Sequence, residues 1–124
     1  DPIPKRKNPK PRLVYKIENN DRPLYAKLID KEISNNSIQL VKRIPWVSVN
    51  SLEDMLREML LRDFYNSVMR GLITEYVEAG ESYLLSAGAW ISNLVRNYDS
   101  FNMVLTSLPG KEKEALQQML DKIE

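Results

Sequence analysis

The sequence contains no cysteine and no histidine, and only four of its 124 residues are glycine. The absence of cysteine excludes disulfides, thiolate nucleophiles and Cys-based metal sites, and the absence of histidine removes the commonest general base and metal ligand. The chain also has no phosphate-binding glycine loop and no G-x-S-x-G motif. We therefore expect a protein that is not an enzyme, has no catalytic residues, and uses no metal, cofactor or small-molecule substrate.

One acidic cluster has a spacing suited to a helix face, and it consists of Glu75, Glu78 and Glu81. Carboxylate metal sites in helical bundles usually include a histidine, and Gly80 interrupts the helical pattern within the cluster. We interpret these three residues as a solvated acidic surface.

Long hydrophobic runs are missing as well. No stretch of about 18 apolar residues is uninterrupted, because charged residues such as Arg62, Asp63 and Arg70 break the longest candidates. The N-terminus has no apolar region of the signal-peptide type. We therefore expect a soluble protein without a membrane segment, located inside the cell in the cytoplasm or nucleoid, or in a virion.

Charge is abundant but unevenly distributed along the chain. The 18 basic and 17 acidic residues leave a formal net charge of +1. Residues 1–50 hold 11 basic and 5 acidic residues, a net charge of +6, whereas residues 51–124 have a net charge of −5. The near-neutral total therefore hides a basic N-terminal half joined to an acidic C-terminal half.

The first 12 residues form the most distinctive segment. Four of the seven prolines lie at positions 2, 4, 9 and 11, and five basic residues are interleaved with them. Proline removes backbone donors and favours extended geometry, so we predict an extended basic arm over residues 1–12. Such an arm suits nucleic-acid phosphates, an acidic protein surface, or a merely solubilising terminus.

A second basic pair, Lys42 and Arg43, precedes Trp46. A tryptophan beside cations can stack on a base or anchor a partner, and it can equally pack in the core. If the protein binds nucleic acid, the expected contact residues are Lys5, Arg6, Lys7, Lys10, Arg12, Lys42, Arg43 and Trp46.

Apolar spacing after the arm predicts a mainly α domain over residues 13–124, a bundle of four or five helices with a possible minor β-ribbon formed by residues 13–17 and 38–44. Ser51 and Asp54 have the spacing of a capping box, Gly80 is a better helix terminator than Gly71, and a turn is expected at Pro109. The predicted helical segments are 23–34, 51–70, 72–79, 82–98, 99–107 and 110–124.

The leading functional hypothesis is a small non-enzymatic nucleic-acid-associated protein that uses the arm on phosphates. No helix-turn-helix, zinc-finger or other nucleic-acid-binding motif is present to specify DNA or RNA. A basic extended arm joined to a helical bundle resembles the coat proteins of filamentous archaeal viruses and small viral or plasmid regulators. That resemblance implies a structural or regulatory role of the viral or plasmid type.

The alternative hypothesis is a helical adaptor or inhibitor that engages a larger machine such as a polymerase. Its basis is a surplus of apolar residues in one predicted helix: Met55, Met59, Leu60, Leu61 and Leu72. They point in more directions than one core absorbs, and methionine-rich surfaces suit adaptable partner binding. This alternative weakens if all of them are buried within one monomer. Self-association is a further expectation, because the acidic half can receive the basic arm of another copy.

Overall fold

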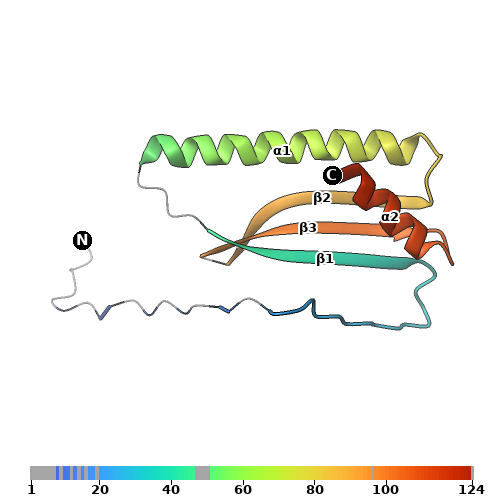
Figure 1. The fold of residues 1–124 in the computed structure, drawn as a ribbon, viewed down its shortest axis with the longest axis horizontal. Coiled ribbons are helices and arrows are strands. Elements are labelled where there is room, and N and C mark those ends of the chain that lie inside the picture. The colour runs from blue at the N-terminus through green and yellow to red at the C-terminus, as the bar shows by residue number, and fades with distance from the viewer. Residues whose placement is uncertain are drawn as a thin grey trace, which may run out of the picture.

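The computed structural model describes residues 8, 10, 11, 13, 15, 17, 18, 20–46, 51–95 and 97–123. Five elements follow one another along these residues: β1 (Asn36–Pro45), α1 (Leu52–Glu78), β2 (Leu84–Val95), β3 (Tyr98–Ser107) and α2 (Glu112–Ile123). The strands form one antiparallel sheet with the order β1-β3-β2. Since β1 and β2 both run antiparallel to β3, they are parallel to each other, and α1 provides the crossover between them (Figure 1).

The predicted four- to five-helix bundle is therefore wrong, because the described residues form an α+β fold with two helices and three strands. The two helices expected over 82–98 and 99–107 are wrong, because this part of the chain contains the strands β2 (Leu84–Val95) and β3 (Tyr98–Ser107). The resemblance to arm-and-bundle viral proteins loses its basis, since it depended on the bundle.

Two features of the sequence explain this error. Bulges between Leu84 and Ser86 and between Asn93 and Val95 shift the alternation along β2, so its apolar residues fall at spacings that imitate a helix. In β3 the period of two is visible in retrospect: Phe101, Met103 and Leu105 lie on one face, and the polar residues Ser100, Asn102 and Thr106 lie on the other.

The predicted helix over residues 23–34 is also absent. This segment has no regular secondary structure, and its apolar residues Leu24, Leu28, Ile29 and Ile33 are all exposed. A short amphipathic helix depends on packing for its stability, and here no element of the described chain covers it. Residues 20–35 instead run in an extended path past β1 (Figure 1).

The strand expected at residues 38–44 is present as β1, but its partner is β3, not residues 13–17. The described residues of 13–17, which are Leu13, Tyr15 and Ile17, have no regular secondary structure.

The helix predicted to start at Ser51 is confirmed. Ser51 Oγ accepts a hydrogen bond from the Asp54 backbone N–H at 3.0 Å and donates one to Asp54 Oδ2 at 2.7 Å. Gly71 does not divide α1, which continues to Glu78. Gly80 then adopts a positive φ of 72°, the left-handed conformation in which glycine ends helices without a steric penalty. The C-terminal helix is confirmed as α2.

The core lies on one face of the sheet, under the C-terminal half of α1 and under α2 (Figure 1). Its buried members come from both helices and from β2 and β3: Met69, Ile73, Leu84, Ala89, Met103, Leu105, Ala115 and Met119. The N-terminal half of α1 contributes none of them. Among the described residues no helix has the length and hydropathy needed to cross a membrane.

Candidate functional site

Most of the predicted basic arm lies outside the described residues. This holds for Lys5, Arg6, Lys7 and Arg12. Lys10 is described and exposed. The expected phosphate contacts of the arm therefore stay predictions.

The structure does not bring Lys42, Arg43 and Trp46 together as one basic surface. Lys42 and Arg43 are consecutive on β1, opposite Phe101 and Ser100 of β3, so their side chains project from opposite faces of the sheet. The Arg43 guanidinium donates a hydrogen bond from Nη2 to the Glu18 backbone oxygen at 2.8 Å. Arg43 therefore tethers the segment that precedes β1.

A second tether fixes the same segment. The Tyr98 hydroxyl donates to the Ile17 backbone oxygen at 2.9 Å and accepts from the Ile17 backbone N–H at 3.2 Å. Tyr98 and Arg43 lie on the same sheet face, since Tyr98 is two residues from Ser100, the register partner of Arg43. The chain that follows the basic arm is thus anchored to the sheet at residues 17 and 18.

Trp46 is half-exposed and lines a groove between the N-terminal half of α1 and the end of β1. The groove has a volume of about 590 Å³. Most of the residues that line the groove are apolar, and three are charged. They are Ile44, Pro45, Trp46, Met55, Glu58, Met59, Leu61, Arg62, Tyr65, Ile91 and Asp99.

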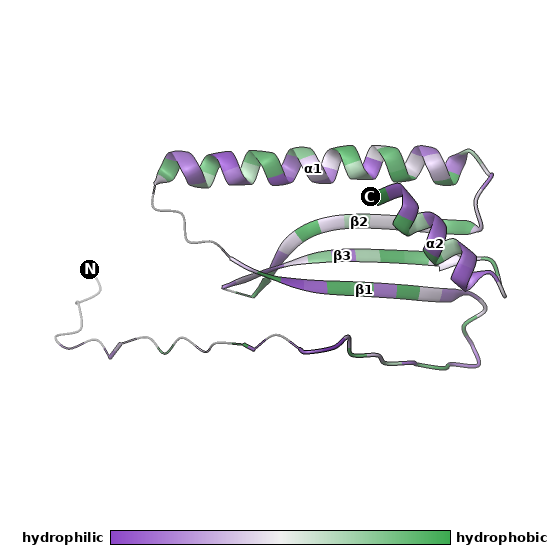
Figure 2. Cartoon of the chain, in the orientation of Figure 1, coloured by the Kyte–Doolittle hydropathy of each residue, from purple (hydrophilic) through white to green (hydrophobic). Residues whose placement is uncertain are grey.

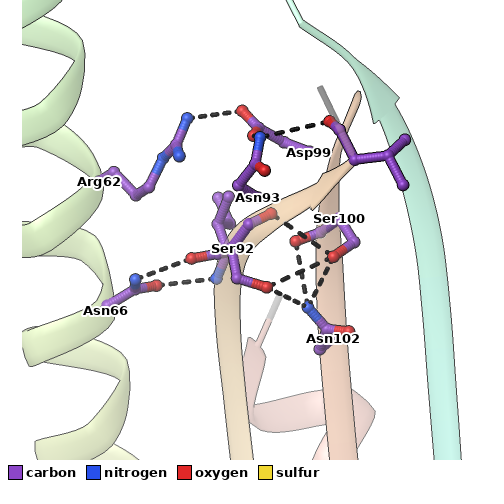
Figure 3. A network of polar contacts seen from close by, with 9 residues as sticks. Arg62, Asn66, Ser92, Asn93, Asp99, Ser100 and Asn102 are labelled. Carbon is purple, nitrogen blue, oxygen red and sulfur yellow. Dashed lines mark hydrogen bonds and ion pairs between the residues drawn. The ribbon is translucent and has the colours of Figure 1, made fainter. Parts of the chain in front are cut away.

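Polar side chains fix α1 against the sheet beside this groove (Figure 3). Arg62 Nη2 lies 2.5 Å from Asp99 Oδ2. The Asn66 amide donates to the Ile91 backbone oxygen at 2.9 Å and accepts from the Ile91 backbone N–H at 2.8 Å. Because β2 is an edge strand, Asn66 occupies ladder positions that would otherwise be open to another strand.

Three further polar residues lie between β2 and β3: Ser92, Ser100 and Asn102. The Asn102 amide donates to Ser100 Oγ at 2.9 Å and to Ser92 Oγ at 3.1 Å (Figure 3). Ser100 and Asn102 are buried, so these hydrogen bonds satisfy groups that burial would otherwise leave unpaired. This network and the Asn66 contacts hold the structure together, and sequence reasoning missed both. The polar residues at alternate positions of β3, Ser100 and Asn102, are the sequence signal for the serine–asparagine network.

The most unusual surface of the molecule is the outward side of α1. Six apolar residues recur at every fourth position, and we call them the α1 ridge: Leu52, Leu56, Leu60, Phe64, Val68 and Leu72. All six are exposed, Leu60 to 69% and Phe64 to 70%. At 100° per residue, Leu60 and Phe64 point away from the side that carries the buried Met69 and Ile73. Figure 2 shows the hydrophobic residues spread along the whole of α1, including the part beyond the core.

Of the surplus apolar residues that sequence reasoning singled out in this helix, none is buried in the monomer. Leu60 and Leu72 belong to the α1 ridge, while Met55, Met59 and Leu61 line the groove and are also exposed. Burial of all five residues within one monomer would weaken the adaptor hypothesis, and the structure shows all five exposed.

The pKa values of charged side chains are shifted at the start of α2, away from α1. The pKa of the Glu112 carboxyl lies below its ordinary value, because the carboxyl interacts first with the Glu112 backbone N–H and then with the Gly110 N–H and the Asn36 amide. The Glu114 carboxylate raises the pKa of the Lys111 ammonium group, from which it accepts a hydrogen bond at 2.9 Å. The Asn36 contact ties the start of α2 to the start of β1, whereas the Lys111–Glu114 pair is local to the first turn of the helix.

Comparison with known proteins brings no further constraint on this surface. No family model matches the chain, and no similar curated protein and no similar solved structure was found. The candidate site is therefore defined by its own geometry, an exposed apolar ridge on α1 beside an apolar groove.

Proposed function

We propose that this chain is a protein-interaction module, without an enzymatic role, that binds another protein surface through the N-terminal part and outward side of α1. The observation that carries the proposal is the α1 ridge, whose six apolar side chains are all exposed. Scattered exposed apolar residues are ordinary, but a contiguous apolar stripe on a soluble domain is typical of an interface.

The composition of the surface agrees with such a role. Leucine, methionine and phenylalanine supply large apolar contacts, and the unbranched methionines adapt their shape to a partner. Met55 and Met59 lie beside the α1 ridge and line the groove, so one partner can cover the ridge and insert a side chain next to Trp46. Charged residues are interspersed along the same helix, which keeps the free protein in solution.

The proposal is tested by site-specific photocrosslinking in the native cell. A photoreactive phenylalanine derivative replaces Phe64 at the centre of the α1 ridge, and in a matched control it replaces Tyr83, which is also an exposed aromatic residue but lies off the ridge. We expect covalent protein adducts at position 64 and few at position 83. If position 64 gives no adduct with any protein, including another copy of this chain, the proposal is wrong.

We propose nucleic-acid binding through residues 5–12 as a second function. Its support is the cluster of five cations in that segment, with Lys10 exposed, and the net charge of +6 over residues 1–50. Arg43 is a weaker candidate for nucleic-acid contact than the sequence suggests, because its guanidinium donates a hydrogen bond to the Glu18 backbone oxygen. Residues 17 and 18, which follow the basic segment in the chain, are anchored on the sheet by Arg43 and Tyr98.

A further inference from the structure

The α1 ridge has a definite occupant. Building on the proposed interaction function, we infer that the occupant is a second copy of this chain, whose α1 packs antiparallel on the first across a two-fold axis. The axis passes between Leu60 and Phe64, the two central residues of the ridge.

Even spacing makes the ridge complementary to itself. A row of six residues at four-residue intervals maps onto itself when its direction is reversed about its midpoint. Leu60 then faces Phe64 of the second copy, and Leu56 faces Val68. An interface between two identical surfaces must have this property, whereas a surface shaped for an unrelated partner need not.

Rows of this spacing also have a defined way of packing. Ridges formed by every fourth residue of two helices interdigitate when the helices cross at about −50°, the commonest arrangement of helix pairs. At that angle the axes diverge on either side of the crossing. The contact is therefore concentrated in the central four residues, from Leu56 to Val68.

Charge favours the antiparallel arrangement over the parallel one. In a parallel pair in register, Glu53, Arg57 and Asp63 each lie close to their own copies, so like charges meet three times. In the antiparallel pair, Arg57 instead lies level with Ser67 of the second copy, and Glu53 lies level with Gly71. These two charges therefore face uncharged residues. The mixture of signs beside the ridge also lacks the uniform charge that would select a strongly acidic or basic partner.

The α1 ridge is exposed along its whole length, from 68% at Leu52 to 53% at Leu72. Figure 1 shows no described element on the side of α1 away from the sheet, so a second helix has room there.

The absence of native cysteine allows a direct test, because any disulfide must come from introduced residues. Leu60→Cys and Phe64→Cys are prepared separately and then mixed under mild oxidation. In the proposed arrangement, residue 60 of one copy lies opposite residue 64 of the other, so the mixture forms disulfide-linked dimers faster than either variant alone. Lys113→Cys, an exposed position on α2, is the control and forms no disulfide-linked dimer when mixed with either variant.

Sedimentation equilibrium of the intact chain gives the second measurement. We expect a dimer with twice the mass of 14.4 kDa, and Phe64→Glu should raise the dissociation constant by roughly thirtyfold or more. Leu108→Glu, which also places a charge at an exposed leucine but off the ridge, should leave the constant within about threefold. Circular dichroism of the variants checks that each is folded.

The outcomes separate this inference from the proposed function. A chain that stays monomeric at every concentration, with photoadducts at position 64 to a different protein, overturns the second-copy inference and leaves the interaction function standing. A monomer with no photoadduct overturns both. Faster oxidation of each single variant alone than of the mixture contradicts the antiparallel axis.

Discussion

Ser100 and Ser107 are two buried serines of the same strand with opposite hydrogen-bonding situations. Ser100 Oγ accepts a hydrogen bond from the Asn102 amide at 2.9 Å. Ser107 is fully buried, yet its Oγ has no hydrogen-bond partner among the described residues. A buried hydroxyl without a partner loses its hydration and gains nothing in return, so the two positions make opposite contributions to stability.

We predict that Ser107→Ala raises the free energy of unfolding by about 0.5–1 kcal/mol, because it removes an unpaired hydroxyl. Ser100→Ala is the matched control and should lower it by about 1–2 kcal/mol, because the buried Asn102 amide loses one of its acceptors. Urea denaturation of the three proteins measures the difference. A loss of stability in Ser107→Ala comparable to that in Ser100→Ala would contradict the prediction.

At the scale of elements, an ionised carboxylate holds the start of α2. The Glu112 carboxylate accepts hydrogen bonds from the Gly110 N–H at 3.0 Å and from the Asn36 amide, so it joins the start of β1 to the first turn of α2. An anionic group in this turn is also favoured by the helix dipole. The lowered pKa of the Glu112 carboxyl follows first from its own backbone N–H and then from these two donors.

A pH dependence follows from the sign of that shift. A carboxyl whose pKa is lower in the folded state stabilises the fold above its ordinary pKa of 4.5 and loses this effect as the pH falls through the lowered value. We predict that Glu112→Gln is less stable than wild type at pH 7 and that the difference shrinks below about pH 4. Thermal unfolding monitored by circular dichroism between pH 3 and pH 7 tests this, and a constant difference across the range would refute it.

The elements also show where sequence patterns are sufficient. The capping box at Ser51, the left-handed Gly80 and the apolar face of α2 are local signals, and the elements they define are present. The β2–β3 hairpin was missed because its bulges disturb the alternation and because β3 is also paired with β1, which is distant in the sequence. Of the candidate site, the surplus apolar residues of α1 were identified from the sequence, but their exposure was not predictable without the sheet.

At the scale of the whole molecule, the chain separates a basic N-terminal segment from a folded domain whose helices and sheet carry the acidic residues. The two are joined at the sheet face, where Tyr98 and Arg43 hold residues 17 and 18. The two proposed functions therefore use different parts of the molecule. The α1 ridge belongs to the crossover helix, and the cations belong to the segment that precedes the anchored residues.

We predict that nucleic-acid binding, measured by fluorescence anisotropy with labelled duplex and single-stranded oligonucleotides, weakens steeply with salt. If all five cations contact duplex phosphates, the logarithm of the affinity falls with the logarithm of salt concentration with a slope of about −4 to −5. Glutamine replaces these five in one variant: Lys5, Arg6, Lys7, Lys10 and Arg12. The control variant carries glutamine at Lys111, Lys113 and Lys122 of the C-terminal region. Equal binding by the two variants at low salt would rule out the arm as the binding segment.

The sequence by itself determined the local features: where α1 begins, where glycine ends it, the amphipathic α2, the split of charge and the missing catalytic residue types. Each depends on neighbouring residues or on composition alone. Tertiary structure decided that residues 84–95 and 98–107 form strands and that residues 23–34 form no helix, because strand pairing and the packing of a short helix depend on distant residues. It also decided which side of α1 the sheet covers. The sheet and α2 lie on the side of Met69 and Ile73, and the central residues of the α1 ridge, Leu60 and Phe64, point the other way.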